Sequence, residues 1–131
     1  MNPQELLYAE THEWVAVAEE GGAKVATVGI SDFAVEALTD LVYIQFSKSG
    51  GDSVSAGDAF GEVESVKAVS DLYSPVTGEV VAVHDKLADK LETLGDDPFG
   101  EGWMLKVKIA DESSLGKLMD YDAYKKMCAE Q

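Results

Sequence analysis

The 131-residue chain carries 25 acidic side chains against 10 basic ones, all of them lysine, and its formal net charge is −15. Nucleic acids and anionic membrane surfaces are bound by clusters of Lys and Arg, so neither is an expected partner. The length and a hydrophobic content of 46% suit one compact domain that spans residues 1–131. The charge alone does not choose between transient encounters with basic protein surfaces and plain solubility.

The single cysteine, Cys128, has no second cysteine in the chain with which to form a disulfide, which is typical of proteins from a reducing, intracellular compartment. The longest apolar runs, such as residues 41–44 and 80–83, are far too short to span a bilayer. The first residues do not have the pattern of a signal peptide. We therefore expect a cytosolic protein with no membrane association.

The N-terminal segment has the pattern of a β-hairpin. Residues 6–8 and 14–17 are apolar strand material, and residues 19–22 end in two glycines that suit a turn. Residues 25–28 are again β-branched and small, as expected of a returning strand. We therefore predict that the chain reverses at residues 19–22 and pairs with itself.

A short helix is predicted next, over residues 32–38. Ser31 stands where an N-cap is needed, and an acidic residue follows in the first turn, where the helix dipole favours it. Phe33, Ala37 and Leu38 are expected near one face of this helix.

From Leu41 onward the pattern changes to short strands separated by turn residues, which predicts a small β-barrel or sandwich. Shifting the chain by 38 residues aligns residues 40–44 with residues 78–82, mostly in apolar character. Two such strand–turn units would flank one central segment and place it at an end of the molecule. This central segment contains Lys67. The turn residues are Gly50, Gly51 and Asp52; Ala56, Gly57 and Asp58; Ser74 and Pro75; Thr77 and Gly78.

The C-terminal part begins with a loop rich in Gly and Pro, after which residues 103–109 alternate as a strand does. Asp111 or Ser113 is expected to cap a first helix, and Asp120 to begin a second. The apolar residues of these helices are predicted to be core contacts and not a cofactor site: Leu115, Leu118 and Met119 in the first, and Tyr121, Tyr124 and Met127 in the second.

Patterns of catalytic and metal sites are missing from the sequence. His12, His84 and Cys128 do not have metal-ligand spacing, and the chain contains no CxxC or HExxH. It also lacks a GxSxG elbow and a phosphate-binding GxxxxGK[ST] loop. Glu62 and Glu64 could be interpreted as a catalytic acid–base pair. In so acidic a chain, two solvated surface side chains are the favoured interpretation. We predict no catalytic residue and no metal.

One lysine stands apart, in the stretch VESVKAVSD of residues 63–71. A Schiff-base role for Lys67 needs a lowered ammonium pKa, and the acidic side chains of Glu62, Glu64 and Asp71 favour the protonated amine instead. From these residues alone, a solvated lysine at a hairpin tip remains an open alternative to a functional one.

The segment GDAFGEVESVKAVSDLYSPVTGEVVAV, residues 57–83, resembles the lipoylation segment of glycine cleavage system H-proteins. Three further blocks resemble that family in the same order: THEWVAV (11–17), VGISDFAVEALTDLVYIQ (28–45) and DPFGEGWMLKVKI (97–109). The resemblance implies a mainly β fold, a barrel-sandwich hybrid of the lipoyl- and biotinyl-carrier type, with short flanking helices and a C-terminal helical extension.

The same resemblance implies that Lys67 carries lipoic acid in amide linkage. Glu64, three residues before the lysine, is expected to present a carboxylate to the lipoylating enzymes, and a solvated turn residue is the open alternative. Thr11, Glu13 and Asp71 are the expected resting site of the loaded arm. The lysine is then a tether, and the reactive atoms belong to the cofactor.

The implied partners are three enzymes that the arm visits in turn. A pyridoxal-phosphate glycine decarboxylase (P-protein) supplies an aminomethyl group, and a tetrahydrofolate-dependent aminomethyltransferase (T-protein) accepts it. Dihydrolipoamide dehydrogenase (L-protein) then reoxidises the dithiol. The chain itself is expected to be a monomeric carrier and not an enzyme, in the bacterial cytoplasm or, for a mature organellar form, in the mitochondrial matrix.

The chain departs from the family pattern at Thr39, where glycine is usual, and at His84 and Gly95, where asparagine is usual. The shape of the loop around residues 84–96 is therefore open. Three alternatives also stay open: a lipoyl-relay or other lipoate carrier of the same fold, a biotin carrier, and an unmodified interaction module. A biotin carrier favours methionines beside the lysine, and Val66 and Ala68 stand there instead.

Overall fold

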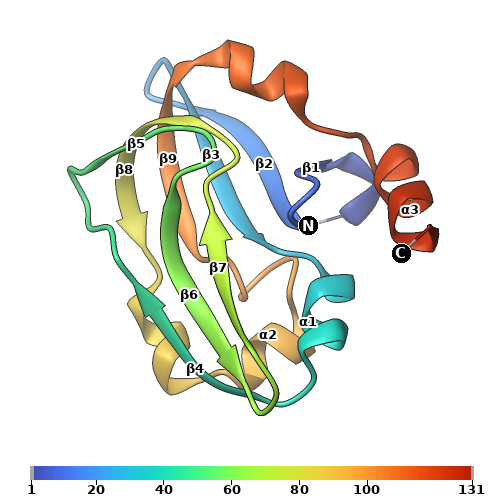
Figure 1. Ribbon diagram of the computed structural model, residues 1–131. Coiled ribbons are helices and arrows are strands. Elements are labelled where there is room, and N and C mark those ends of the chain that lie inside the picture. The colour runs from blue at the N-terminus through green and yellow to red at the C-terminus, as the bar shows by residue number, and fades with distance from the viewer. Residues whose placement is uncertain (1, 131) are drawn as a thin grey trace.

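The computed structural model describes residues 2–130, which form two antiparallel sheets packed face to face (Figure 1). Neither sheet closes on itself. The expectation of a mainly β fold with two small sheets and short helices is confirmed. In the order of their pairing, the first sheet contains β1 (Leu7–Tyr8), β2 (Glu13–Glu20), β3 (Ala23–Ile30), β9 (Leu105–Asp111), β8 (Thr77–Val83) and β5 (Ser53–Val54), and the second contains β4 (Leu41–Phe46), β6 (Ala59–Ser65) and β7 (Val69–Tyr73).

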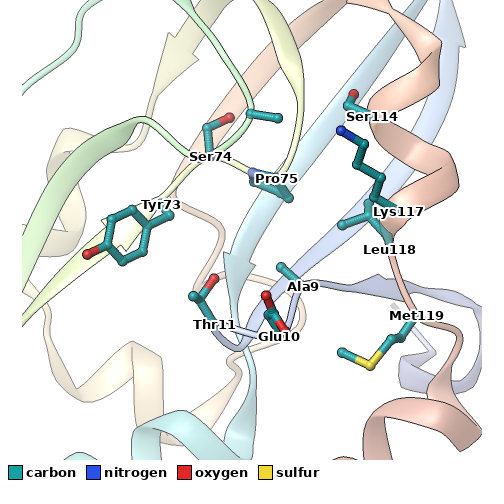
Figure 2. A pocket seen from close by; sticks show the side chains of 12 residues that line it. Ala9, Glu10, Thr11, Tyr73, Ser74, Pro75, Ser114, Lys117, Leu118 and Met119 are labelled. Carbon is teal, nitrogen blue, oxygen red and sulfur yellow. The ribbon is translucent and has the colours of Figure 1, made fainter.

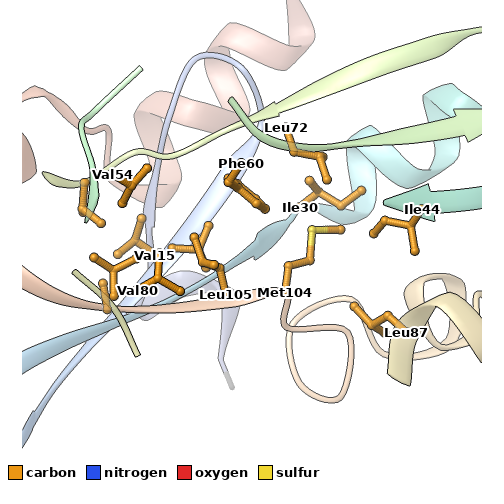
Figure 3. Close-up of a cluster of buried hydrophobic side chains, with 14 of the residues drawn as sticks. Val15, Ile30, Ile44, Val54, Phe60, Leu72, Val80, Leu87, Met104 and Leu105 are labelled. Atoms are coloured by element: carbon orange, nitrogen blue, oxygen red, sulfur yellow. The ribbon is translucent and has the colours of Figure 1, made fainter. Parts of the chain in front are cut away.

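The main hydrophobic core fills the space between the two sheets (Figure 3). Phe60 and Val63 of β6 face Ile30 of β3 and Leu105 of β9, and all four are almost completely buried. Because side chains alternate across a strand, burying Val63 turns its neighbour Glu64 outward. The core therefore decides which face of β6 reaches solvent.

The predicted hairpin is confirmed as the β2–β3 pair, whose register runs from Glu13 opposite Ile30 to Glu20 opposite Ala23. Gly21 and Gly22 form the two-residue connection with φ angles of 60° and 83°. Left-handed angles at both positions suit the tight turns that match the twist of paired strands, and glycine adopts them without steric cost.

The helix predicted after the hairpin is α1 (Asp32–Leu38), and the Ser31 hydroxyl accepts a hydrogen bond from the backbone N–H of Ala34 at 3.2 Å. Of the face expected for this helix, Leu38 packs on the core together with Ala34 and Val35, whereas Ala37 is exposed. Ala37 lies three residues after Ala34, so it is near the same face but at its solvent-exposed edge.

The C-terminal segment departs from its predicted helices at Met119. A 3₁₀ helix, η3 (Glu112–Lys117), forms with Asp111 as its cap, but it stops before the predicted end. Met119 instead exchanges two backbone hydrogen bonds with Tyr8, at 2.8 and 2.7 Å, which requires extended backbone. The second predicted helix is α3 (Tyr121–Ala129), capped by Asp120 as expected.

Three further short helices complete the fold: η1 (Pro3–Glu5), η2 (Asp85–Asp89) and α2 (Glu92–Asp96). The last two occupy the region of residues 84–96. His84 enters it with its Nδ1 2.7 Å from the carbonyl oxygen of Trp103 and its ring stacked on the Trp103 ring. The strand predicted over residues 103–109 is β9, which begins two residues later, at Leu105, and ends at Asp111. Within residues 2–130, no helix has the length and apolar character needed to cross a membrane.

Candidate functional site

Lys67 lies at the turn between β6 and β7, at the end of the molecule where α1 and α2 also lie (Figure 1). The last paired residues are Glu64 and Val69. Val66 and Lys67 form the corner of the turn, and both are exposed. The lysine amine is therefore accessible to a large partner, as a hairpin tip requires.

Ser65 fixes the backbone of this turn. Its N–H donates to the carbonyl oxygen of Ala68 at 2.8 Å, and its hydroxyl oxygen accepts from the N–H groups of Ala68 (3.1 Å) and Lys67 (3.3 Å). Ser65 is only 6% exposed. The sequence analysis did not single out Ser65, although a serine two and three residues before turn N–H groups is a known local pattern. The result is a rigid backbone that carries a free lysine side chain.

The outer face of β4, β6 and β7 near the tip is apolar as well as acidic. Tyr43, directly opposite Glu64 in the β4–β6 register, is 48% exposed, and Val66 is 66% exposed. Val42 and Val69 are also exposed. The sequence predicted strands here but gave no sign that these residues stay outside, because a β-bulge between Leu41 and Tyr43 shifts the alternation. Glu64 thus lies on a surface suited to protein contact.

A pocket of about 170 Å³ lies beside β7, between the segment that begins β2 and helix α1. It brings together Thr11, Glu13 and Asp71, the three residues expected at the resting site, whereas Glu64 and Lys67 do not line it. The complete lining is Thr11, His12, Glu13, Ile30, Ala34, Ala37, Leu38, Val63, Ser70, Asp71 and Leu72. Apolar side chains thus surround a small number of polar groups, the usual composition of a ligand pocket.

Glu13 is the buried acid of this pocket, with 1% of its surface exposed. The Thr11 hydroxyl donates to its Oε1 atom, and the Tyr73 N–H donates to Oε2 at 3.3 Å. Burial raises the pKa of Glu13 to about 7, and the two hydrogen bonds oppose this rise. Near neutral pH the carboxyl is therefore balanced between its neutral and ionised forms, and a cation entering the pocket favours ionisation.

Asp71 stands at the rim of the same pocket and is exposed. Its Oδ2 atom lies 3.4 Å from the Tyr73 hydroxyl, a long contact for a hydrogen bond. Its partner across the β6–β7 pair is Glu62, so its side chain belongs to the outer face. Asp71 can contact a group as it enters the pocket from solvent, whereas Glu13 can contact it only inside the pocket.

A larger pocket of about 560 Å³ adjoins the small one and shares Thr11 with it (Figure 2). The β1–β2 connection, residues 73–75 and the C-terminal segment form its walls, and Lys117 and Glu10 are its charged side chains. Among the residues that the structure describes, every buried polar side-chain atom has a hydrogen-bond partner, and no three His, Cys, Asp or Glu gather as metal ligands would. Nothing in this larger space therefore points to a particular ligand.

The model of the glycine cleavage H-protein family matches residues 6–131. The chain belongs to this family. A glycine cleavage system H protein of Rhodopirellula baltica is 59% identical over 129 residues, which cover 98% of this chain and 96% of that protein. One from Marinobacter nauticus is 52% identical over 122 residues, which cover 93% and 91%. The crystal structure of such a protein from Mycobacterium marinum superposes with a TM-score of 0.85 at 37% identity, covering 98% of this chain and 99% of that one.

These comparisons confirm the family that the four sequence blocks resemble. The chain is therefore a component of the glycine cleavage system. They do not bear on the roles of single residues. Lys67, Glu64, Thr11, Glu13 and Asp71 therefore remain predictions, which the geometry sharpens into experiments.

The buried carboxyl of Glu13 predicts a pH-dependent stability. Because the pKa of Glu13 is about 7 in the folded protein against an ordinary value of 4.5, the native state binds more protons than the unfolded chain between these two pH values. Its stabilising contribution is complete below about pH 4.5 and is lost as the pH rises through about 7. We expect the parent protein to lose roughly 1–3 kcal/mol of unfolding free energy relative to Glu13→Gln between about pH 5 and about pH 8.

Urea unfolding of both proteins at the two pH values measures this difference, and other titrating groups cancel in the comparison. A difference between parent and variant that stays constant over this range would contradict the assignment.

Proposed function

We propose that this chain is lipoylated on Lys67 and carries an aminomethyl group between the enzymes of the glycine cleavage system without catalysing a reaction itself. The observation that carries the proposal is the exposed amine of Lys67 on a turn fixed by Ser65, in a chain of the H-protein family. Residues 1–131 then act as one lipoyl-carrier domain. The cytoplasm is the proposed compartment, in keeping with the bacterial relatives, with the mitochondrial matrix for an organellar form.

The division of labour follows from the chemistry. A lipoyl dithiolane supplies a disulfide that opens, accepts a group and closes again by thiol and redox chemistry. The residues of this chain hold the tether at an exposed tip, so that the P-protein, T-protein and L-protein can each receive the arm. The lipoylating enzymes need the same access to the Lys67 amine.

The pocket at Glu13 is the proposed resting site of the loaded arm. Asp71 is four residues after Lys67, so the two lie at most roughly 13 Å apart, the length of four fully extended residues, which is within the reach of a lipoyl-lysine side chain. The arm would follow the edge of β7, with Leu38 and Val63 covering its apolar part. The cationic amine of the aminomethyl group would meet Asp71 at the rim and Glu13 inside, and a partly desolvated ion pair is stronger than an exposed one.

The first test addresses the attachment site. Lys67→Arg keeps the positive charge but offers no amine that a lipoylating enzyme can acylate. We expect the lipoyl mass increment to disappear from this variant and to remain in the control Lys48→Arg. Intact mass and peptide mapping after co-expression with lipoate supply the measurement. A persistent increment in Lys67→Arg, or one mapped to Lys48 or Lys86, would refute the proposal.

A second prediction concerns Glu64. Its exposed carboxylate makes no hydrogen bond or ion pair to the described residues and therefore contributes little to the stability of the fold. Glu64→Ala should lower the initial rate of lipoylation roughly three- to tenfold, the cost of one contact to a partner, with an unchanged melting temperature. Glu62→Ala, two residues earlier on the same outer face, is the matched control. An unchanged rate accompanied by a lower melting temperature would favour a purely structural role.

The third prediction concerns the resting site. One reduced lipoyl thiol, one formaldehyde and one ammonia give the aminomethyl thioether and one water, so the lipoylated protein can be loaded without the decarboxylase. We expect Glu13→Gln and Asp71→Asn to keep lipoylation of Lys67 but to shorten the lifetime of this adduct, because each removes a charge that holds the amine. Mass spectrometry follows the decay, and Glu10→Gln, which lines only the larger pocket, is the control. Lifetimes equal to the parent in both variants would place the resting arm elsewhere.

A further inference from the structure

The small pocket has two walls that come from separate elements. The first is the segment that leads into β2, with Thr11, His12 and Glu13. The second is α1, which contributes Ala34 and Leu38. For an arm to rest between these walls, their distance and orientation must be held constant.

One hydroxyl group contacts both walls. The Oη atom of Tyr124 in α3 lies 2.7 Å from Nδ1 of His12 and 2.5 Å from Oγ of Ser31. Ser31 is the N-cap of α1, and its hydroxyl oxygen also accepts from the Ala34 N–H. The chain from His12 through Tyr124 and Ser31 to Ala34 thus crosses from the first wall to the second.

The ring of Tyr124 is held independently of these hydrogen bonds. Its centroid lies 4.4 Å from that of Tyr8, with only 7° between the ring planes. Tyr124 is 2% exposed, and burial raises the pKa of its hydroxyl, which therefore stays neutral and both donates and accepts. The packing fixes the place of the ring, so removing the hydroxyl takes away the link between His12 and Ser31 and leaves the ring stack in place.

The residue on the first wall needs such support. His12 has a φ angle of 81°, a left-handed conformation that residues other than glycine rarely adopt. Its N–H donates to the Ala9 carbonyl oxygen at 2.9 Å, and its own carbonyl accepts from the Ser31 N–H at 3.0 Å. Glu13 follows directly, so the orientation of the His12 backbone sets the position from which the Glu13 carboxyl enters the pocket.

We infer that Tyr124 is a positioning residue for the resting arm: its hydroxyl ties the Thr11–Glu13 wall to α1, and α3 thereby takes part in sheltering the aminomethyl group. This inference rests on the proposed function of the pocket. It gives the C-terminal helix a role in the carrier cycle in addition to its role in packing.

The test uses the lipoylated, aminomethyl-loaded full chain with Tyr124→Phe, which keeps the ring stack and removes the hydroxyl. We expect the adduct lifetime to fall roughly three- to tenfold, because one hydrogen bond that supports the docked state is lost. Lipoylation of Lys67, whose turn lies in another part of the fold, should proceed at the parent rate. His12→Asn is the second variant, because Asn tolerates the left-handed conformation but is too short to replace the imidazole contact. It should shorten the lifetime as well.

Tyr8→Phe is the control for a merely structural effect. It removes a hydrogen bond of 2.7 Å to the Pro3 carbonyl oxygen from the other ring of the same stack, away from the pocket. We expect it to lower the melting temperature but to leave the adduct lifetime unchanged. A parent-like lifetime in both Tyr124→Phe and His12→Asn, or a lifetime that falls equally in Tyr8→Phe, would overturn the inference. If Glu13→Gln and Asp71→Asn also leave the lifetime unchanged, the resting site itself fails, and the two failures are thus distinguishable.

Discussion

The register between β6 and β7 is the constraint on which the site depends. Val63 must face the core, and it pairs with Ser70 of β7. A slip by one residue would bury the Glu64 carboxylate and expose Val63. Burying an unpaired charge and exposing an apolar side chain both destabilise the folded state, so the core selects the observed register. The register in turn places Val66 and Lys67 at the corner of the hairpin. The burial of Val63 therefore decides where the Lys67 amine reaches solvent.

Three of the buried polar side chains lie at the Lys67 turn and around the pocket that is proposed to hold the arm. Ser65 and Ser31 are buried and hydrogen-bonded, so they stabilise a turn and a helix at little cost. Glu13 differs, because its ionised form is disfavoured by burial although two donors reach it. A glutamine there would pack without this penalty. The proposed function gives this carboxyl a purpose, because a cationic amine in the pocket would favour its ionised form.

The two ends of the chain support the site together. Tyr8 pairs with Met119 through the backbone and stacks on Tyr124, which joins β1 to the C-terminal segment. Through its hydroxyl Tyr124 reaches His12 and Ser31, so the same cluster that covers Trp14 also holds the pocket walls. Packing and the proposed shelter of the arm are therefore coupled in one aromatic cluster.

The sequence by itself determined what local patterns encode: the hairpin at Gly21 and Gly22, the Ser31 cap and a small β-barrel or sandwich, while the two-sheet fold and the lysine at its tip followed from the family resemblance. Tertiary structure alone decided that Glu13 is buried against the Tyr73 N–H, 60 residues away, and that Tyr124 meets Ser31 across 93 residues. Turns and caps depend on residues within one turn of chain, whose preferences can be read directly. Burial and the pKa shift that follows it depend on which distant segments pack together, and no local pattern of residues contains that information.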